Sequence, residues 1–188
     1  MNVPNAITLS RLAVTAATFV CLELVADPER PDPTLIWLSF ALFLFAALTD
    51  FLDGYLARKW NMVTAFGRVA DPFADKVLIA GSLVLLLKFP VATAVMPFWY
   101  VVVVIAREFL VTAIRGVVEA SGRPFPADKL GKWKMVTQCW TAASLMMLIA
   151  GVDSWHALTV TGLWLSFALT VVSGVNYVLK AKDVLFAR

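Results

Sequence analysis

Long, nearly uninterrupted apolar runs dominate the chain, and short polar links separate them. Each run is close to the roughly 20 residues that a helix needs to cross a hydrocarbon core about 30 Å thick. The runs do not alternate between apolar and polar residues, as the strands of a transmembrane barrel would. The pattern therefore predicts six transmembrane helices, over residues 6–25, 35–54, 72–90, 91–114, 132–152 and 156–179.

The composition agrees with a membrane protein. Of the 188 residues, 61% are hydrophobic and only 15% are charged, whereas an average soluble domain has about 25% charged residues. The links are too short to hold a separate soluble domain, so residues 1–188 are expected to form one all-α integral membrane domain. We expect membrane lipids around it and no nucleic acid partner.

Basic residues are concentrated in alternate links, which predicts the orientation in the membrane. The first and third links contribute only Arg30 and Lys88. The remaining links and the C-terminal tail hold most of the others, namely Arg58, Lys59, Arg68, Arg115, Arg123, Lys129, Lys132, Lys134, Lys180, Lys182 and Arg188. We therefore expect a multi-pass protein of the inner, cytoplasmic membrane, with both termini in the cytoplasm and a basic side that faces anionic headgroups and phosphorylated metabolites.

Four aspartates stand near the ends of two predicted helices, where a charge is costly to bury. Asp50 and Asp53 follow fifteen uncharged residues, 35–49, so a full-length second helix must carry both at its cytoplasmic end. Asp71 and Asp75 open the third helix. Residues three or four positions apart share one face of a helix. Because a short link makes the two helices antiparallel, we expect the four carboxylates to converge.

Converging carboxylates repel one another unless a cation lies between them. Hard divalent cations prefer carboxylate oxygens, and magnesium is often held by carboxylates together with substrate phosphates. Gly54, Ala57 and Gly67 lie nearby and leave room for a bulky ligand at the backbone, while Arg58 offers a fork that suits phosphate. These residues indicate a pyrophosphate site with a metal. The alternative is a structural network of ion pairs with the basic neighbours Arg58, Arg68 and Lys76.

The complete motif is D-x2-D-G-x2-A-R-x8-G-x3-D-x3-D, from Asp50 to Asp75. It resembles the signature of the CDP-alcohol phosphatidyltransferases, integral membrane enzymes with six transmembrane helices that usually work as homodimers. The resemblance extends over essentially the whole chain. It implies that an alcohol hydroxyl attacks the phosphorus attached to the lipid of a CDP-linked donor and that CMP is released.

The resemblance also implies roles for individual residues. Asp50, Asp53, Asp71 and Asp75 would hold Mg²⁺ or Mn²⁺, and Asp75 would also act as the catalytic base that takes the proton of the alcohol. The CDP-donor-binding residues would be Gly54, Ala57, Arg58, Thr64 and Gly67.

The acceptor is predicted from basic residues elsewhere. Arg107 and Arg115 are eight positions apart and share one face of the fourth predicted helix, and Lys132 opens the fifth. Two arginines and a lysine suit a phosphorylated acceptor. The alternatives are that the arginines snorkel to the headgroups and that the lysine only follows the positive-inside bias. Glu108 is not expected to pair with Arg107, because adjacent positions point about 100° apart on a helix.

Looser motifs narrow the expected activity. The segments "REF", "GKWK" and "NVPNAITLSR" resemble the branch of the family that uses sn-glycerol 3-phosphate, which adds Asn5 and Thr8 near the nucleotide. The expected reaction transfers a phosphatidyl group from CDP-diacylglycerol to sn-glycerol 3-phosphate and gives phosphatidylglycerophosphate and CMP, in phospholipid biosynthesis. Alternatives within the family use inositol phosphate as the acceptor, or phosphatidylglycerol to give cardiolipin. An alternative of another class is a cation transporter, which also places carboxylates in a membrane.

Overall fold

A computed structural model describes residues 3–59, 65–122, 125 and 129–185, with side chains for 8–49, 67, 70–122, 125 and 129–184. Every regular element in these ranges is helical. The elements are α1 (Val3–Glu23), α2 (Pro33–Lys59), α3 (Ala65–Leu86), α4 (Pro90–Val95), α5 (Phe98–Ala120), α6 (Lys129–Ile149), a 3₁₀ turn η1 (Asp153–Trp155) and α7 (His156–Leu185). The prediction of an all-α fold is confirmed for this part of the chain.

Prolines and glycines determine several helix ends. The predicted helices 72–90 and 91–114 are separated by the short α4, because Pro90 begins α4 and Pro97 precedes α5 in an extended conformation. Proline has no N–H to donate and disfavours helical geometry in the residue before it. Gly122 and Gly151, which follow the ends of α5 and α6, have φ values of 78° and 87°. Glycine adopts this left-handed conformation readily and so ends a helix without strain.

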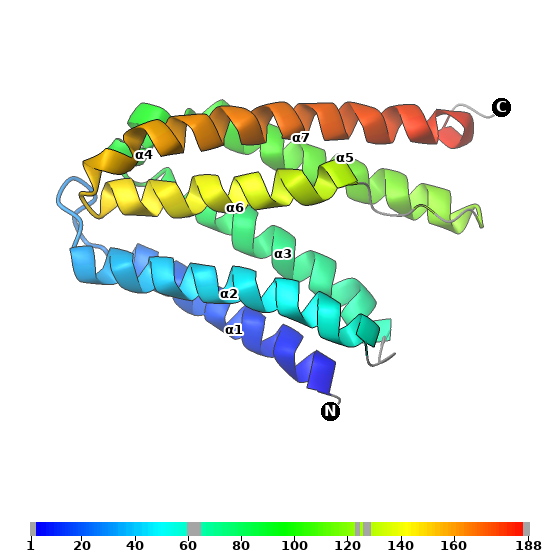
Figure 1. Cartoon of the computed structure of the whole chain (residues 1–188), viewed down its shortest axis with the longest axis horizontal. Coiled ribbons are helices and arrows are strands. Elements are labelled where there is room, and N and C mark those ends of the chain that lie inside the picture. Colours follow the sequence, from blue (N-terminus) through cyan, green and yellow to red (C-terminus); the bar gives the residue numbers. More distant parts are fainter. Residues whose placement is uncertain (1–2, 60–64, 123–124, 126–128, 186–188) are drawn as a thin grey trace.

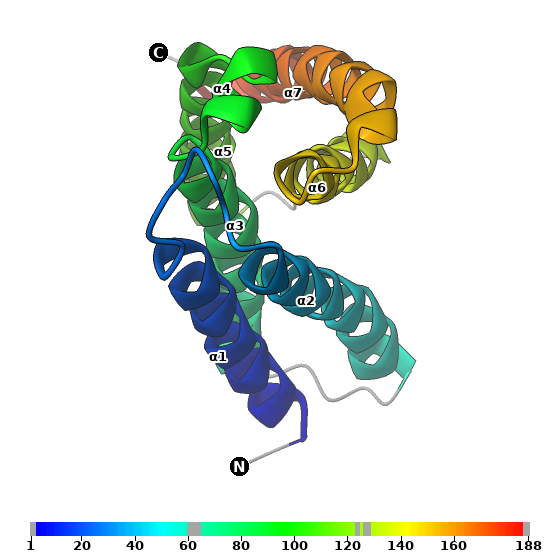
Figure 2. The same ribbon diagram turned by 90° about the vertical axis from the view of Figure 1, so that its left-hand side faces the viewer.

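The long helices form two groups, which Figure 2 shows most clearly. In one group α1 packs against α2 and α3, and in the other α7 packs against α5 and α6. The groups meet where α2 and α3 contact α6 and where α3 contacts α5. The end of α2, the beginnings of α1, α3 and α6, and the ends of α5 and α7 lie toward one end of the molecule (Figure 1). We call this the motif end, because it carries the described motif residues, 50–59 in α2 and 65–75 in α3.

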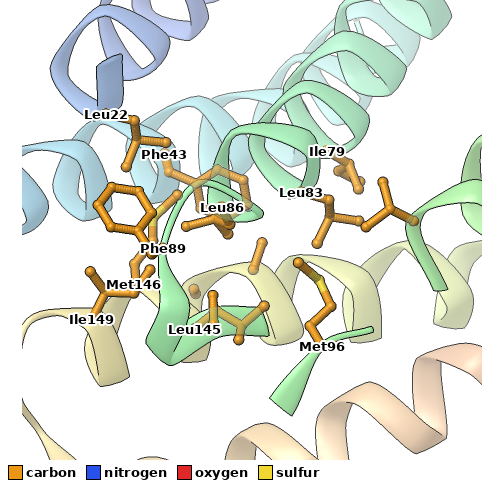
Figure 3. Packing of buried hydrophobic residues seen from close by; sticks show 14 of the residues in the cluster. Leu22, Phe43, Ile79, Leu83, Leu86, Phe89, Met96, Leu145, Met146 and Ile149 are labelled. Carbon is orange, nitrogen blue, oxygen red and sulfur yellow. The ribbon is translucent and has the colours of Figure 1, made fainter. Parts of the chain in front are cut away.

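The apolar core lies toward the opposite end. Figure 3 shows side chains from α1, α2, α3 and α6 and from the segment around α4 packed together. Leu22, Phe43, Leu86, Phe89 and Met96 in this cluster are completely buried. The close packing of these side chains holds the two groups together through van der Waals contacts.

Large apolar side chains also cover the outside of the molecule. Phe98, Phe109 and Trp133 are 70%, 72% and 63% exposed. By length and composition, one helix in the described ranges, Asp153–Val184, is long and apolar enough to cross a membrane. The six spans and the cytoplasmic termini therefore stay predictions.

Candidate active site

The two aspartates of α3 are both held by side chains of α1. Thr8 Oγ1 donates a hydrogen bond of 2.6 Å to Asp71 Oδ1. One helical turn further on, Arg11 Nη1 lies 3.3 Å from Asp75 Oδ1 and forms an ion pair with it. Thr8 and Arg11 are three positions apart, and Asp71 and Asp75 are four apart, so one face of α1 meets one face of α3. Both carboxylates are thereby oriented.

The same face of α1 is buried along its length. Thr8, Arg11, Thr15 and Thr18 are each at most 2% exposed. Further along the helices, a Cβ added at Gly81 of α3 would clash with the ring of Phe19 in α1. The absence of a side chain at Gly81 lets α1 approach α3 closely, and this approach places Thr8 and Arg11 beside the acids.

The acids fit the expected divalent metal as far as the structure describes them. Asp71 and Asp75 provide hard oxygen ligands on one face of α3, and the hydrogen bonds from α1 are of the kind that orients metal ligands. The side chains of Asp50 and Asp53 lie outside the described residues. Within the described side chains, no group of three or more histidine, cysteine, aspartate or glutamate residues forms a metal site, so the four-aspartate site stays a prediction.

Most of the predicted nucleotide contacts also lie outside the described side chains. These residues are Asn5, Gly54, Ala57, Arg58 and Thr64. Gly67 is buried near the beginning of α3. Thr8, which was predicted near the nucleotide, donates a hydrogen bond to Asp71, one of the predicted metal ligands; its nucleotide contact stays a prediction. The alternative prediction was an ion-pair network with Arg58, Arg68 and Lys76. The structure shows an ion pair of Asp75 with a different residue, Arg11.

A second buried polar group joins α5 and α6. Glu108 Oε1 accepts a hydrogen bond of 3.0 Å from Arg107 Nη1 and a second one from Lys134 Nζ. The expectation that Arg107 and Glu108 would not pair is therefore wrong. Their Cβ atoms point in different directions, but both side chains are long, and Lys134 from the neighbouring helix attracts the carboxylate to the same place. We call Arg107, Glu108, Lys134, Arg115, Ser173 and Tyr177 the basic cluster.

Helix α7 completes the basic cluster. Arg107 Nη2 donates a hydrogen bond of 3.0 Å to Ser173 Oγ, and Arg115 Nη2 donates one of 3.1 Å to Tyr177 Oη. The guanidinium carbons of both arginines lie over the Tyr177 ring, 5.5 and 6.0 Å from its centroid. Arg107 is only 9% exposed, so it does not snorkel to the surface. The prediction that the two arginines share one face is confirmed, because both contact Tyr177.

The structure assigns different positions to the two lysines at the beginning of α6. Lys132, predicted as an acceptor ligand, is exposed, whereas Lys134 is 5% exposed and belongs to the basic cluster. Residues two positions apart point to nearly opposite sides of a helix. The rotation of α6 against α5 therefore brings Lys134, and not Lys132, to Arg107 and Glu108.

The acidic pair and the basic cluster lie close together. Lys76 Nζ, next to Asp75 on α3, donates a hydrogen bond to Thr112 Oγ1 of α5. Thr112 stands one turn after Glu108 and in turn donates a hydrogen bond of 2.6 Å to the Glu108 carbonyl oxygen. This pair of hydrogen bonds joins α3 to α5 one residue after Asp75 and one turn after Glu108, so we consider the two polar regions together as one candidate site at the motif end.

Several residues of this site were not assigned a role from the sequence. Arg11 had a usable signal, because it lies three positions after Thr8 and so on the same helix face. Ser173 and Tyr177 are four positions apart on α7, but a serine and a tyrosine at this spacing are common in packed helices. The pairing of Glu108 with Lys134 could not be predicted from spacing, because it depends on how α5 and α6 are rotated relative to each other.

Comparison with known proteins shows the family to which this chain belongs. Residues 1–172 match the sequence profile of the CDP-alcohol phosphatidyltransferases. A Bacillus subtilis relative named CDP-diacylglycerol–glycerol-3-phosphate 3-phosphatidyltransferase is 36% identical over 184 residues, which cover 94% of this chain and 93% of the relative. A Rickettsia felis protein of the same name is 32% identical, with 94% and 93% covered.

A third relative, from Mycobacterium tuberculosis, is named a probable phosphatidylglycerophosphate synthase. It is 32% identical over 180 residues, which cover 96% of this chain and 81% of the relative. These matches confirm the resemblance that the motif indicated. Because the profile and the relatives align over most of its length, the chain belongs to the CDP-alcohol phosphatidyltransferase family.

Proposed function

We propose that this protein transfers a phosphatidyl group from CDP-diacylglycerol to sn-glycerol 3-phosphate, with phosphatidylglycerophosphate and CMP as products. The family supplies the type of reaction, and the names of the relatives specify this donor and this acceptor for those proteins. In this chain, the proposal is supported most by the basic cluster, because it has the charge that a phosphorylated acceptor requires.

The charge of the basic cluster favours a phosphate monoester. The cluster contains three cations, Arg107, Arg115 and Lys134, and one anion, Glu108. Within the described side chains, the Nε atoms of both arginines are buried and have no hydrogen-bond partner. Two excess positive charges in a buried place are costly unless an anion joins them. A monoester such as glycerol 3-phosphate is close to a dianion at neutral pH, whereas the diester phosphatidylglycerol carries one charge.

The residues of the motif would bind the donor and accept the proton of the acceptor hydroxyl. A hydroxyl of the acceptor attacks the phosphorus that carries the diacylglycerol, the bond from that phosphorus to the oxygen of CMP breaks, and the proton of the hydroxyl passes to Asp75. Arg11 orients the Asp75 carboxylate, and Thr8 orients that of Asp71. A divalent cation held by Asp50, Asp53, Asp71 and Asp75 would neutralise the charge that develops on the leaving CMP.

The proposal includes six membrane spans, with the motif end at the cytoplasmic side. The beginning of α1 and the end of α7 lie toward that end in Figure 1, and exposed apolar side chains such as Phe109 and Trp133 would contact lipid. The acyl chains of the donor could then stay in the membrane while its headgroup enters the site. The homodimer that the family implies is part of the same proposal.

The reaction is tested with purified protein, CDP-diacylglycerol, Mg²⁺ and radiolabelled sn-glycerol 3-phosphate. We expect release of CMP together with label in the lipid fraction. In parallel reactions, labelled inositol phosphate or labelled phosphatidylglycerol replaces sn-glycerol 3-phosphate as the acceptor. Equal labelling from either one would contradict the proposed acceptor, and the absence of CMP release with every acceptor would contradict the reaction itself.

A further inference from the structure

Glu108 is the single carboxylate of the basic cluster, and the proposed reaction gives it no role. Its side chain is 16% exposed and lies on α5, between the neighbouring Arg107 and Lys134 of α6. Both cations donate to the same carboxylate oxygen, Oε1. Hydrogen bonds between ionised groups are the strong ones, so this one oxygen holds two cations from two helices beside each other.

Neither cation uses all of its donors in these contacts. A guanidinium has five N–H groups and an ammonium has three. Arg107 uses one nitrogen for Glu108 and one for Ser173, and its Nε has no partner among the described residues. Both cations therefore keep N–H donors that their contacts with Glu108 and Ser173 do not use.

Arg107 is restrained on its other sides as well. Its guanidinium lies over the Tyr177 ring, and a Cβ added at Gly174 would lie 3.3 Å from Arg107 Cγ. The side chain therefore has little room to follow a phosphate that arrives in another position. This arrangement favours a preformed anion site over one that the ligand must assemble, and preformed sites lose less entropy on binding.

We propose that Glu108 is a positioning residue for the acceptor: it holds Arg107 and Lys134 so that their remaining N–H groups converge on the phosphate of the acceptor. This inference rests on the proposed function. It predicts that loss of the Glu108 charge weakens acceptor binding, although the site then becomes more positive. A purely electrostatic view predicts the opposite, because removal of a negative charge should attract the phosphate more strongly.

The test compares Glu108→Gln with Glu119→Gln. Both variants remove one carboxylate from α5, but Glu119 is exposed and lies outside the basic cluster. We expect Glu108→Gln to raise the KM for sn-glycerol 3-phosphate by about tenfold or more, as for the loss of a charged hydrogen bond, and to change the KM for CDP-diacylglycerol by less than about twofold. The control should change neither constant. An unchanged or lowered acceptor KM, or an equal rise for both substrates, would overturn the proposal.

A second pair of variants covers the case in which Glu108→Gln does not fold because Lys134 is left buried without its carboxylate. Lys134→Met removes that charge, and the double variant Glu108→Gln/Lys134→Met is compared with it. We expect the double variant to have a higher acceptor KM than Lys134→Met, because the added loss of the Glu108 charge releases Arg107. Equal acceptor KM values for the two variants would refute the positioning role. An inactive wild-type protein would instead contradict the proposed reaction, so the two failures are distinguishable.

Discussion

The two polar regions of the site pair their charged side chains in different ways. Between α1 and α3, each aspartate has a donor of its own, with Thr8 on Asp71 and Arg11 on Asp75. In the basic cluster, the cations Arg107 and Lys134 share the single carboxylate of Glu108. The first region is therefore arranged around negative charge, and the second keeps an excess of positive charge.

This difference indicates whether each region is suited to bind a cation or an anion. Acids whose orientation is fixed by hydrogen bonds are suited to a cation. Cations that outnumber their acid are suited to an anion, because the uncompensated charge is stabilised only when the ligand arrives. The hydrogen bond between Lys76 and Thr112 links the two helices, α3 and α5, that carry these regions, and the proposed reaction needs both kinds of ligand.

The largest effect should come from the acidic region. Asp71→Asn preserves the shape of the side chain and the bond from Thr8 but removes the charge needed for a metal. We expect turnover to fall by at least about 100-fold and the Tm to change little, measured by CMP release and thermal unfolding. Asp153→Asn, an exposed carboxylate in η1 at the other end of the molecule, is the control. Near-normal turnover of Asp71→Asn would contradict the metal proposal.

A large but selective effect is expected in the basic cluster. Arg115→Ala removes a cation that donates to Tyr177, and we expect the acceptor KM to rise by about 10- to 100-fold. The KM for CDP-diacylglycerol should stay nearly constant. Tyr177→Phe, which keeps the ring and removes only the hydroxyl, should have a smaller effect in the same direction. An equal rise in both KM values after Arg115→Ala would argue against separate regions for donor and acceptor binding.

The packing of α1 on α3 can be disturbed without any change of charge. Gly81→Ala places a Cβ against the Phe19 ring, and we expect it to lower the free energy of unfolding by about 1–3 kcal/mol. Gly116→Ala in α5 is a matched control, because its Cβ would have nothing within 4 Å. Alanine is favoured over glycine in a helix, so the control should be neutral or slightly stabilising. Identical Tm values for the two variants would show that the close approach of the helices is unimportant.

The smallest effect is expected at Lys132. This lysine is exposed on the side of α6 away from the basic cluster, so we expect Lys132→Ala to change the acceptor KM by about fivefold or less. Steady-state kinetics with labelled sn-glycerol 3-phosphate would measure it beside Arg115→Ala. If Lys132→Ala raised the acceptor KM as strongly as Arg115→Ala, the acceptor site would have to lie elsewhere.

Much of this protein could be predicted from local spacing. Apolar runs gave the long helices because each run is continuous and long enough for a membrane. The predicted boundaries were wrong where polar residues extend a helix, since α2 continues to Lys59 and α3 begins at Ala65, and where Pro90 and Pro97 separate α4 from its neighbours. The acids of the motif were recognised because positions three and four apart on one helix must share a face. Family membership followed from the same motif and is confirmed.

The sequence by itself thus determined the helices, the acids and the family, because these depend on neighbours along the chain. Only the tertiary structure decided which partners the charged residues have. Arg11 meets Asp75 across 64 positions, Glu108 meets Lys134 across 26, and Arg107 meets Ser173 across 66. Such pairs depend on how each helix is rotated against the next, and a difference of two positions, as between Lys132 and Lys134, turns a side chain from the site to the surface.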